Sequence, residues 1–260
     1  MKPIGVFDSG VGGLTVVAAI QRHLPGESIL YLGDTARLPY GTKSPATVGR
    51  YTHRNVQFLV DRGVKAVVVA CNTASAVALD EIETPVPLWG VIEPGARQAV
   101  AATAGRVGVI ATESTIRSSA YERALQRLRP DLQVTSRACP LFVPLVEEGW
   151  HDDPVTVEVA RRYLEPLLAE EIDTLVLGCT HYPLLVPVLE RVAGGGVGLI
   201  DSAEAVAREV ADGLRQADLM GTESRPEHHF CVTDVGERFA RIARMVLGEG
   251  EVSLELVDVA

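Results

Sequence analysis

The sequence has few lysines and no long apolar run. Only three lysines occur, Lys2, Lys43 and Lys65, so a cofactor held as a Schiff base, such as PLP, has few anchors. We therefore expect a site that works without a cofactor. No 18 apolar residues follow one another, and the first residues carry no apolar run long enough for a signal peptide. These absences predict a cytoplasmic protein with no membrane partner.

Cysteine and positive charge are also scarce. The four cysteines lie far apart without a CxxC pair, which argues against a disulfide framework and against a metal site. The formal net charge is −10, whereas nucleic-acid binding depends on Lys and Arg that neutralise phosphates. We expect a small-molecule ligand and no nucleic-acid partner.

What the sequence does have is enough apolar material for a substantial core. Its 260 residues are 47% hydrophobic, which suits one large globular domain or two of ordinary size.

One sequence pattern, a short apolar run followed by a cysteine and helix-capping side chains, occurs twice. The run 67–70 precedes Cys71, and the run 175–178 precedes Cys179. Each run is typical of a buried parallel strand, and parallel sheets bind ligands at the carboxyl ends of their strands. The start of a helix there would stabilise a thiolate. A lone cysteine is most often a buried apolar residue, which is how we interpret Cys139 and Cys231, but the repetition favours chemistry at the other two.

The strand pattern repeats along with the cysteines. Strands expected near Ile4, Ser28, Val67 and Leu88 return near Val107, Leu132, Thr174 and Val197, at offsets of about 103 to 109 residues. This spacing predicts an internal duplication. We expect an α/β fold of two pseudo-symmetric three-layer domains with mainly parallel sheets, residues 1–95 plus 208–260 and residues 96–207, and an active site in the cleft between them.

Helices and a returning tail complete this expectation. Helices are predicted at 45–62, 96–104 and 202–214, and a further helix from Pro154 should kink or end at Pro166. The tail is expected to add a strand at 229–232, a helix at 235–247 and a strand at 254–257, and to pack on the first half.

Two loops near the amino terminus carry polar and glycine residues. The stretch 8–15 has the backbone freedom to hold an anion, although a plain tight turn explains it equally well and the Lys-Ser/Thr pair of a Walker loop is missing. The stretch 33–41 follows a second strand, and loops of this length at a strand end are often functional.

Two cysteines on opposite walls of one cleft suit a proton transfer that uses two bases. To invert a carbon, one group removes its proton from one face while another supplies a proton to the opposite face. Free cysteine titrates at about 8.5, so each thiol needs help, which Asp8 and His181 would provide. Glu147 either orients His181 or belongs to a solvated surface turn.

The sequence resembles the glutamate racemase family over nearly its whole length. Four motifs carry the resemblance, namely 7–14 (FDSGVGGL), 33–37 with 39–41 (GDTAR, PYG), 71–75 (CNTAS) and 178–185 (GCTHYPLL). Such enzymes work without a cofactor and supply D-glutamate for bacterial peptidoglycan, hence for cell-wall biogenesis and cell shape. Aspartate racemase is a near relative with a similar cysteine pair.

The resemblance also implies roles for individual residues. Cys71 would act on D-glutamate and Cys179 on L-glutamate, assisted by Asp8, Glu147 and His181. Asp8 and His181 are also implied as substrate contacts, together with Ser9, Pro39, Tyr40, Gly41, Asn72, Thr73, Thr115 and Thr180, of which Thr115 is expected in a variable turn. The long amino-terminal extension of members activated by a cell-wall precursor is lacking, which argues against that regulation.

Two other classes of function remain open from the residues alone. A cysteine hydrolase or amidase would use Cys179 as nucleophile and His181 as base, and would need only one thiol. A non-catalytic binding protein would share the plan of two α/β lobes around a crevice. A homodimer is expected only because it is the commonest assembly.

Overall fold

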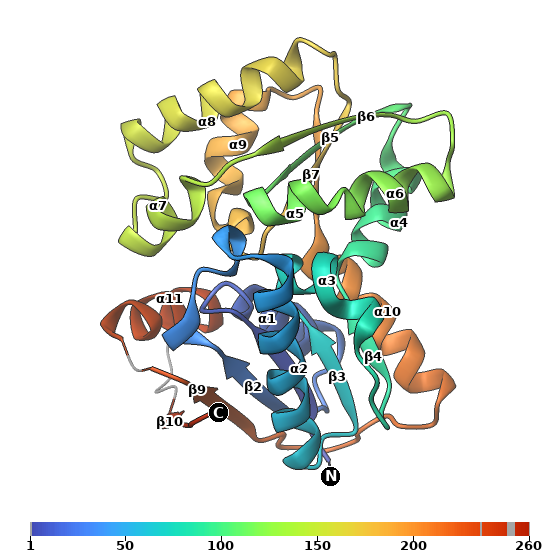
Figure 1. Cartoon of the computed structure of the whole chain (residues 1–260), viewed down its shortest axis with the longest axis vertical. Helices are drawn as coiled ribbons and strands as arrows, with labels where there is room; N and C mark the ends of the chain where they lie inside the picture. The colour runs from blue at the N-terminus through green and yellow to red at the C-terminus, as the bar shows by residue number, and fades with distance from the viewer. Residues whose placement is uncertain (1, 235, 249–252, 260) are drawn as a thin grey trace.

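The computed structural model describes residues 2–234, 236–248 and 253–259 of the chain (Figure 1). Two parallel β-sheets lie one above the other in this view, and helices pack on both faces of each. The α/β fold that the sequence predicts, with two three-layer halves and parallel sheets, is therefore confirmed.

The first sheet, in the lower half of Figure 1, has six strands among the described residues, in the order β10-β9-β2-β1-β3-β4. All neighbouring pairs are parallel. The tail of the chain returns to this sheet, as expected, because β9 pairs with β2. The strands are β1 (Ile4–Asp8), β2 (Ile29–Gly33), β3 (Ala66–Val69), β4 (Leu88–Gly90), β9 (His228–Val232) and β10 (Leu254–Leu256).

The second sheet repeats the arrangement of the first. Its four described strands have the order β6-β5-β7-β8 and are all parallel. The first half of the chain has the matching order β2-β1-β3-β4, so β5 to β8 correspond one by one to β1 to β4, and the expected repeat is confirmed. The strands are β5 (Arg106–Ala111), β6 (Gln133–Ala138), β7 (Thr174–Gly178) and β8 (Gly198–Asp201).

Both faces of the first sheet are apolar because both are covered. In β1, Ile4 and Val6 belong to the core on one face and Phe7 to the core on the other, and all three are fully buried. The first face packs against α1 (Leu14–His23), α10 (Ser202–Gln216) and α11 (Glu237–Leu247), and the second against α2 (Pro45–Asp61) and α3 (Asn72–Ala78).

The second sheet is enclosed in the same way. One face packs against α7 (Phe142–Glu148), α8 (Pro154–Leu168) and α9 (Val186–Ala193), and the other against α4 (Ile92–Ala102) and α6 (Ala120–Leu128). A short helix, α5 (Glu113–Ser118), follows β5.

Several helices begin where the sequence places a capping side chain. Ser44 accepts a hydrogen bond from the backbone N–H of Thr47 at the start of α2, and Asp153 accepts one from Val155 at the start of α8. In both cases a proline follows the cap, at the position where its missing N–H leaves no hydrogen bond unmade.

Two helix boundaries differ from the expectation. We expected a helix from Ala96, but α4 begins at Ile92, because Pro94 is accommodated in a first turn that needs no N–H donor. Pro166 lies inside α8, which continues to Leu168 before it ends. Of the expected helix 235–247, Val235 lies outside the described residues.

The domain division stays a proposal. The strands of the first sheet fall within residues 1–95 and 208–260, and those of the second within 96–207. Helix α10 spans the proposed boundary at residue 208, and its Val206, Val210 and Leu214 are buried in the core of the first sheet.

Candidate active site

A cavity of about 390 Å³, including the space open at its mouth, lies between the carboxyl ends of the two sheets. Segments that follow β1, β2, β3, β5 and β7 line it, together with α7. Both sheets therefore contribute to one site, at the strand ends where parallel α/β folds bind ligands.

Cys71 reaches this cavity from the first sheet. It follows β3 as the residue before α3, and its Sγ lies 3.6 Å from the hydroxyl of Ser9. Burial raises the pKa of the Cys71 thiol to about 12, and the nearby charge of Asp8 adds to the effect. The backbone N–H of Ala74 and the Ser9 hydroxyl lower the pKa by less. The expected stabilisation of a thiolate by the helix start is therefore outweighed, and Cys71 is a thiol at neutral pH.

Cys179 reaches the cavity from the second sheet and has a histidine beside it. Its Sγ lies 3.9 Å from Nδ1 of His181, and Nε2 of the same ring lies 3.3 Å from a carboxylate oxygen of Glu147 on α7. Burial alone would lower the pKa of His181, but the hydrogen bonds to Cys179 and Glu147 raise it to about 10. His181 is therefore an imidazolium at neutral pH, with its charge beside the Cys179 sulfur.

The segment after Cys179 differs from the expectation in one respect. No α-helix starts directly behind this cysteine, because a 3₁₀ turn, η4 (Tyr182–Leu185), precedes α9. Pro183 lies in the first turn of η4, where its missing N–H leaves no hydrogen bond unmade.

Asp8 joins the two halves behind the cavity. One carboxylate oxygen accepts a hydrogen bond from the backbone N–H of Gly10 at 2.9 Å, and the other accepts one from the hydroxyl of Thr180 at 3.2 Å. Burial raises the pKa of Asp8, while the charge of His181 and the N–H groups of Gly10 and Gly13 oppose this shift. The glycine-rich loop thus folds onto a carboxylate of the protein itself.

A threonine cluster closes the cavity from another side. The hydroxyl of Thr73, in the first half, lies 2.9 Å from that of Thr112 and 3.2 Å from that of Thr115, both in the second half. Thr115 lies in α5, so the expected turn at this position is wrong. The cap that Thr112 provides accounts for the helix, since its side chain accepts a hydrogen bond from the Thr115 N–H.

Tyr40 lines the cavity from the loop after β2 and is held by a buried carboxylate. Its hydroxyl donates to Asp34, which is fully buried and also accepts hydrogen bonds from Arg37 at 2.8 Å and from Thr233 at 3.0 Å. Burial raises the pKa of Tyr40, so the hydroxyl stays a donor. This network fixes the loop that follows β2.

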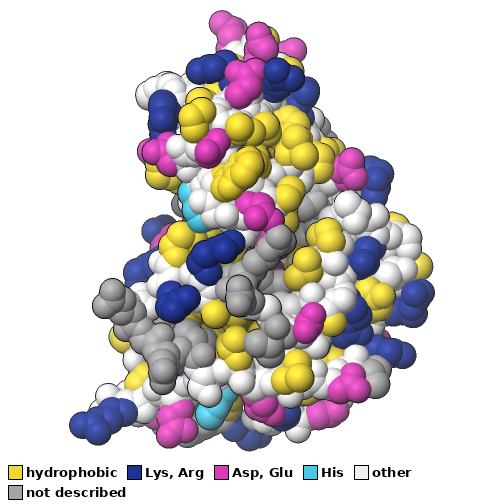
Figure 2. Space-filling model, turned by 90° about the vertical axis from the view of Figure 1, so that its left-hand side faces the viewer, with side chains coloured by type: hydrophobic (Ala, Val, Ile, Leu, Met, Phe, Trp, Pro, Cys, Tyr) yellow, Lys and Arg dark blue, Asp and Glu magenta, His cyan; other side chains and the backbone are white. Residues whose placement is uncertain are grey.

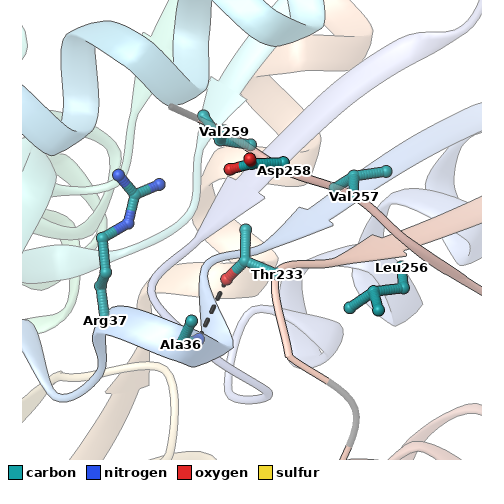
Figure 3. A pocket seen from close by; sticks show the side chains of 7 residues that line it. All are labelled: Ala36, Arg37, Thr233, Leu256, Val257, Asp258 and Val259. Carbon is teal, nitrogen blue, oxygen red and sulfur yellow. Dashed lines mark hydrogen bonds between the residues drawn. The ribbon is translucent and has the colours of Figure 1, made fainter.

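A second pocket adjoins this network, because Arg37 and Thr233 also line it (Figure 3). Arg37, Thr233 and Asp258 supply its polar side chains, and the dashed line in Figure 3 marks the hydrogen bond from the Ala36 N–H to Thr233. Neither Cys71 nor Cys179 lines it, so we place the candidate active site in the first cavity.

Nearly all the site residues that the sequence predicts line the cavity or lie directly behind its wall. Asp8 and Thr115 are buried just behind its wall, at 0% and 2% exposure. Four further lining residues were not named from the sequence: Gly10 and Leu38, which lie in the two loops that it singled out, Thr112, a capping residue after a strand, and Val143, which carried no signal. The predicted residues that line the cavity are Ser9, Pro39, Tyr40, Gly41, Cys71, Asn72, Thr73, Glu147, Cys179, Thr180 and His181.

Two kinds of feature are absent from the described residues, a metal-binding cluster and a membrane-spanning helix. No three His, Cys, Asp or Glu side chains in this part of the chain are grouped as metal ligands would be. None of the helices described here has the length and apolar character that crossing a membrane requires.

The fold and the cavity define a class of protein: a two-domain parallel α/β protein with one cysteine from each half in a shared interdomain cavity. Two acid–base groups, one from each half, in a single cavity suit the inversion of a carbon atom.

Comparison with known proteins identifies the family. The Asp/Glu/Hydantoin racemase family model matches residues 5–210. Glutamate racemase from Geobacter metallireducens is 55% identical over 95% of this chain and 93% of its own, and that from Syntrophus aciditrophicus is 53% identical over 99% and 97%. The chain belongs to this family and is a racemase.

Solved structures agree with this assignment. The crystal structure of a glutamate racemase isoform from Bacillus anthracis has a TM-score of 0.95 at 43% identity and covers 99% of this chain and 97% of its own. The glutamate racemase from Francisella tularensis in complex with D-glutamate has a TM-score of 0.94 at 39% identity, with coverage of 99% and 98%.

Proposed function

We propose that this racemase interconverts L-glutamate and D-glutamate without a cofactor, with Cys71 and Cys179 as the two acid–base groups. The observation that carries the proposal is that one thiol from each half lines the same cavity. The names of the similar proteins, which are glutamate racemases, support glutamate as the substrate.

In the direction from L- to D-glutamate, Cys179 is the base and Cys71 the acid. The imidazolium of His181 stabilises the Cys179 thiolate, which removes the α-proton from one face of the substrate. Cys71 keeps its proton at neutral pH, because burial raises its pKa to about 12, and it delivers that proton to the opposite face.

In the direction from D- to L-glutamate the two roles exchange, so Cys71 must first lose its proton. The negative charge of Asp8 opposes this step. A bound substrate brings an ammonium group, and a positive charge near Cys71 and Asp8 lowers the pKa of both. Substrate binding itself thus prepares Cys71 to act as a base.

Local donors hold the substrate. The chain has a net charge of −10, so long-range attraction of an anionic amino acid is unfavourable and its capture depends on N–H and hydroxyl groups in the cavity. Asp8 and Glu147 assist catalysis with His181, and Asp8 accepts the substrate ammonium. The proposed substrate contacts are Asp8, Ser9, Pro39, Tyr40, Gly41, Asn72, Thr73, Thr115, Thr180 and His181.

The wider role we propose follows the resemblance to glutamate racemases: a cytoplasmic enzyme that supplies D-glutamate for peptidoglycan synthesis, cell-wall biogenesis and cell shape. We also propose a homodimer. Leu141, Trp150 and Val155 of the second half are about half exposed, and Figure 2 shows hydrophobic side chains gathered on the upper part of one face. Light scattering that gives the monomer mass at micromolar concentrations would contradict the dimer.

The test of the proposed function is the decay of the circular dichroism of L-glutamate incubated with the pure protein. The wild type should bring the signal to zero with no added cofactor. Cys71→Ser and Cys179→Ser should each abolish the decay while the protein stays folded, whereas Cys231→Ser, outside the cavity, should not. Near-normal activity in the Cys71 variant would favour a single-cysteine enzyme, and a signal that never decays would favour a binding protein.

A further inference from the structure

One buried tyrosine contacts the segments of both cysteines. Tyr121 lies on α6 of the second half and is 1% exposed. Its hydroxyl donates a hydrogen bond of 2.7 Å to Oδ1 of Asn72, the residue after Cys71 in the first half. This hydrogen bond therefore crosses from one half of the molecule to the other.

The ring of the same tyrosine packs against the residue before the other cysteine. A Cβ atom at Gly178 would lie 3.0 Å from Cε2 of Tyr121, so the glycine allows this close approach. One at Gly95 would lie 3.3 Å from the Tyr121 hydroxyl oxygen. Two glycines thus leave the space that Tyr121 fills between the two cysteine segments.

The hydrogen bond determines which way the Asn72 amide faces. The Tyr121 hydroxyl donates to Oδ1 of Asn72, and burial, which raises the pKa of Tyr121, keeps on the hydroxyl the proton that this bond needs. The other polar atom of the amide, Nδ2, is buried and has no hydrogen-bond partner among the described residues. Asn72 is 2% exposed and lines the catalytic cavity, so this N–H₂ group is a donor in need of an acceptor.

We propose that Tyr121 is a positioning residue that turns the Asn72 amide so that its N–H₂ group, and not its oxygen, meets a carboxylate of the bound amino acid. The proposal rests on the proposed function, which supplies an anionic substrate. Without the tyrosine hydroxyl, the amide is free to rotate and to present Oδ1, which repels a carboxylate. Because the tyrosine belongs to the second half, the amide is oriented only while the two halves are in contact here.

The test measures the dissociation constant of D-glutamate by calorimetry for Tyr121→Phe, which keeps the ring that packs on Gly178. We expect the constant to rise at least about tenfold, the effect of losing one hydrogen bond to a charged group. Tyr163→Phe, which loses a half-buried tyrosine hydroxyl outside the cavity, is the matched control and should leave the constant unchanged. An unchanged constant for Tyr121→Phe overturns the inference.

A double-mutant cycle separates positioning from a general structural effect. In an Asn72→Ala background the amide is gone, so Tyr121→Phe should weaken binding no further. Equal losses in both backgrounds would mean that Tyr121 acts through other contacts, and would overturn the inference.

A second variant tests the same orientation of the Asn72 amide even if Tyr121→Phe fails to fold. Asn72→Asp keeps an oxygen that accepts from Tyr121 and replaces the N–H₂ group by another oxygen, so it should bind D-glutamate more weakly than Asn72→Ala. Binding as tight as that of Asn72→Ala, or tighter, contradicts the proposed orientation. A wild type that binds D-glutamate without racemising it would contradict the proposed function alone.

Discussion

Replacing Glu147 by glutamine removes the charge that holds His181 as an imidazolium and leaves a side chain of the same size. The carboxylate oxygen lies 3.3 Å from Nε2 of His181, and the two side chains are only 13% and 6% exposed. At an effective dielectric constant of about 20, opposite charges at this distance attract by about 5 kcal/mol. The sulfur of Cys179 also raises the pKa of His181, so we expect the loss of Glu147 to remove part of the shift.

The pKa of His181 should therefore fall from about 10 toward its ordinary value of 6.5. A fall of about one to two units, equivalent to about 1.4 to 2.7 kcal/mol, would move the alkaline limb of the pH profile of kcat/KM to lower pH by the same amount. At pH 9 the variant should then be about two- to tenfold slower than the wild type. L- and D-glutamate have equal free energies in water, so kcat/KM must fall equally in the two directions.

The assay is kcat/KM in both directions from pH 6.5 to 10.5, followed by circular dichroism. Glu148→Gln is the matched control, because it removes the same charge one residue further along and does not line the cavity. An alkaline limb at the same pH in Glu147→Gln and the wild type would refute the proposed coupling between Glu147, His181 and Cys179.

Two further predictions concern close packing and alkaline stability. A Cβ atom at Gly12 would lie 2.4 Å from the Thr180 hydroxyl and 2.5 Å from Nδ1 of His181, so Gly12→Ala should abolish racemisation. The control is Gly49→Ala, on helix α2 with open space around it, which should keep activity and gain about 1 kcal/mol in the free energy of unfolding. The folded-state pKa of His181, about 10, exceeds its ordinary value of 6.5, so its contribution to the free energy of unfolding is complete below pH 6.5 and is lost as pH rises to 10. The folded-state pKa of Cys71, about 12, exceeds its ordinary value of 9.0, so its contribution is lost between pH 9 and 12. The urea midpoint should therefore fall as pH rises from 7 to 10, and a constant midpoint would contradict both shifts.

Most of the fold follows from local features of the sequence. Strands buried on both faces are short apolar runs, so 67–70 and 175–178 stand out, and the cysteine at the end of each identifies equivalent strands in the two halves. The error at α4 has a local cause too, because Glu93-Pro94-Gly95 is a common turn sequence that here forms the first turn of a helix. Propensity alone does not separate these two outcomes.

Much of the site could be listed from the sequence, but its arrangement could not. The sequence left two alternatives for Glu147, a partner that orients His181 or part of a solvated turn, and a separation of 34 residues could not decide between them. Leu38 and Val143 line the cavity although an apolar side chain carries no local mark of such a position. The hydrogen bond from Tyr121 to Asn72 depends on the packing of two halves, which no single segment encodes.

The central claim, that two thiols act from opposite faces, is tested most directly by racemising L-glutamate in D₂O and analysing both isomers at early conversion. If Cys179 removes the α-proton and Cys71 delivers a proton equilibrated with solvent, nearly every D-glutamate molecule carries deuterium at the α-carbon and the recovered L-glutamate is almost unlabelled. A single base would return label to the starting isomer and carry original hydrogen into the product. Substantial retention of hydrogen in D-glutamate would contradict the two-cysteine account.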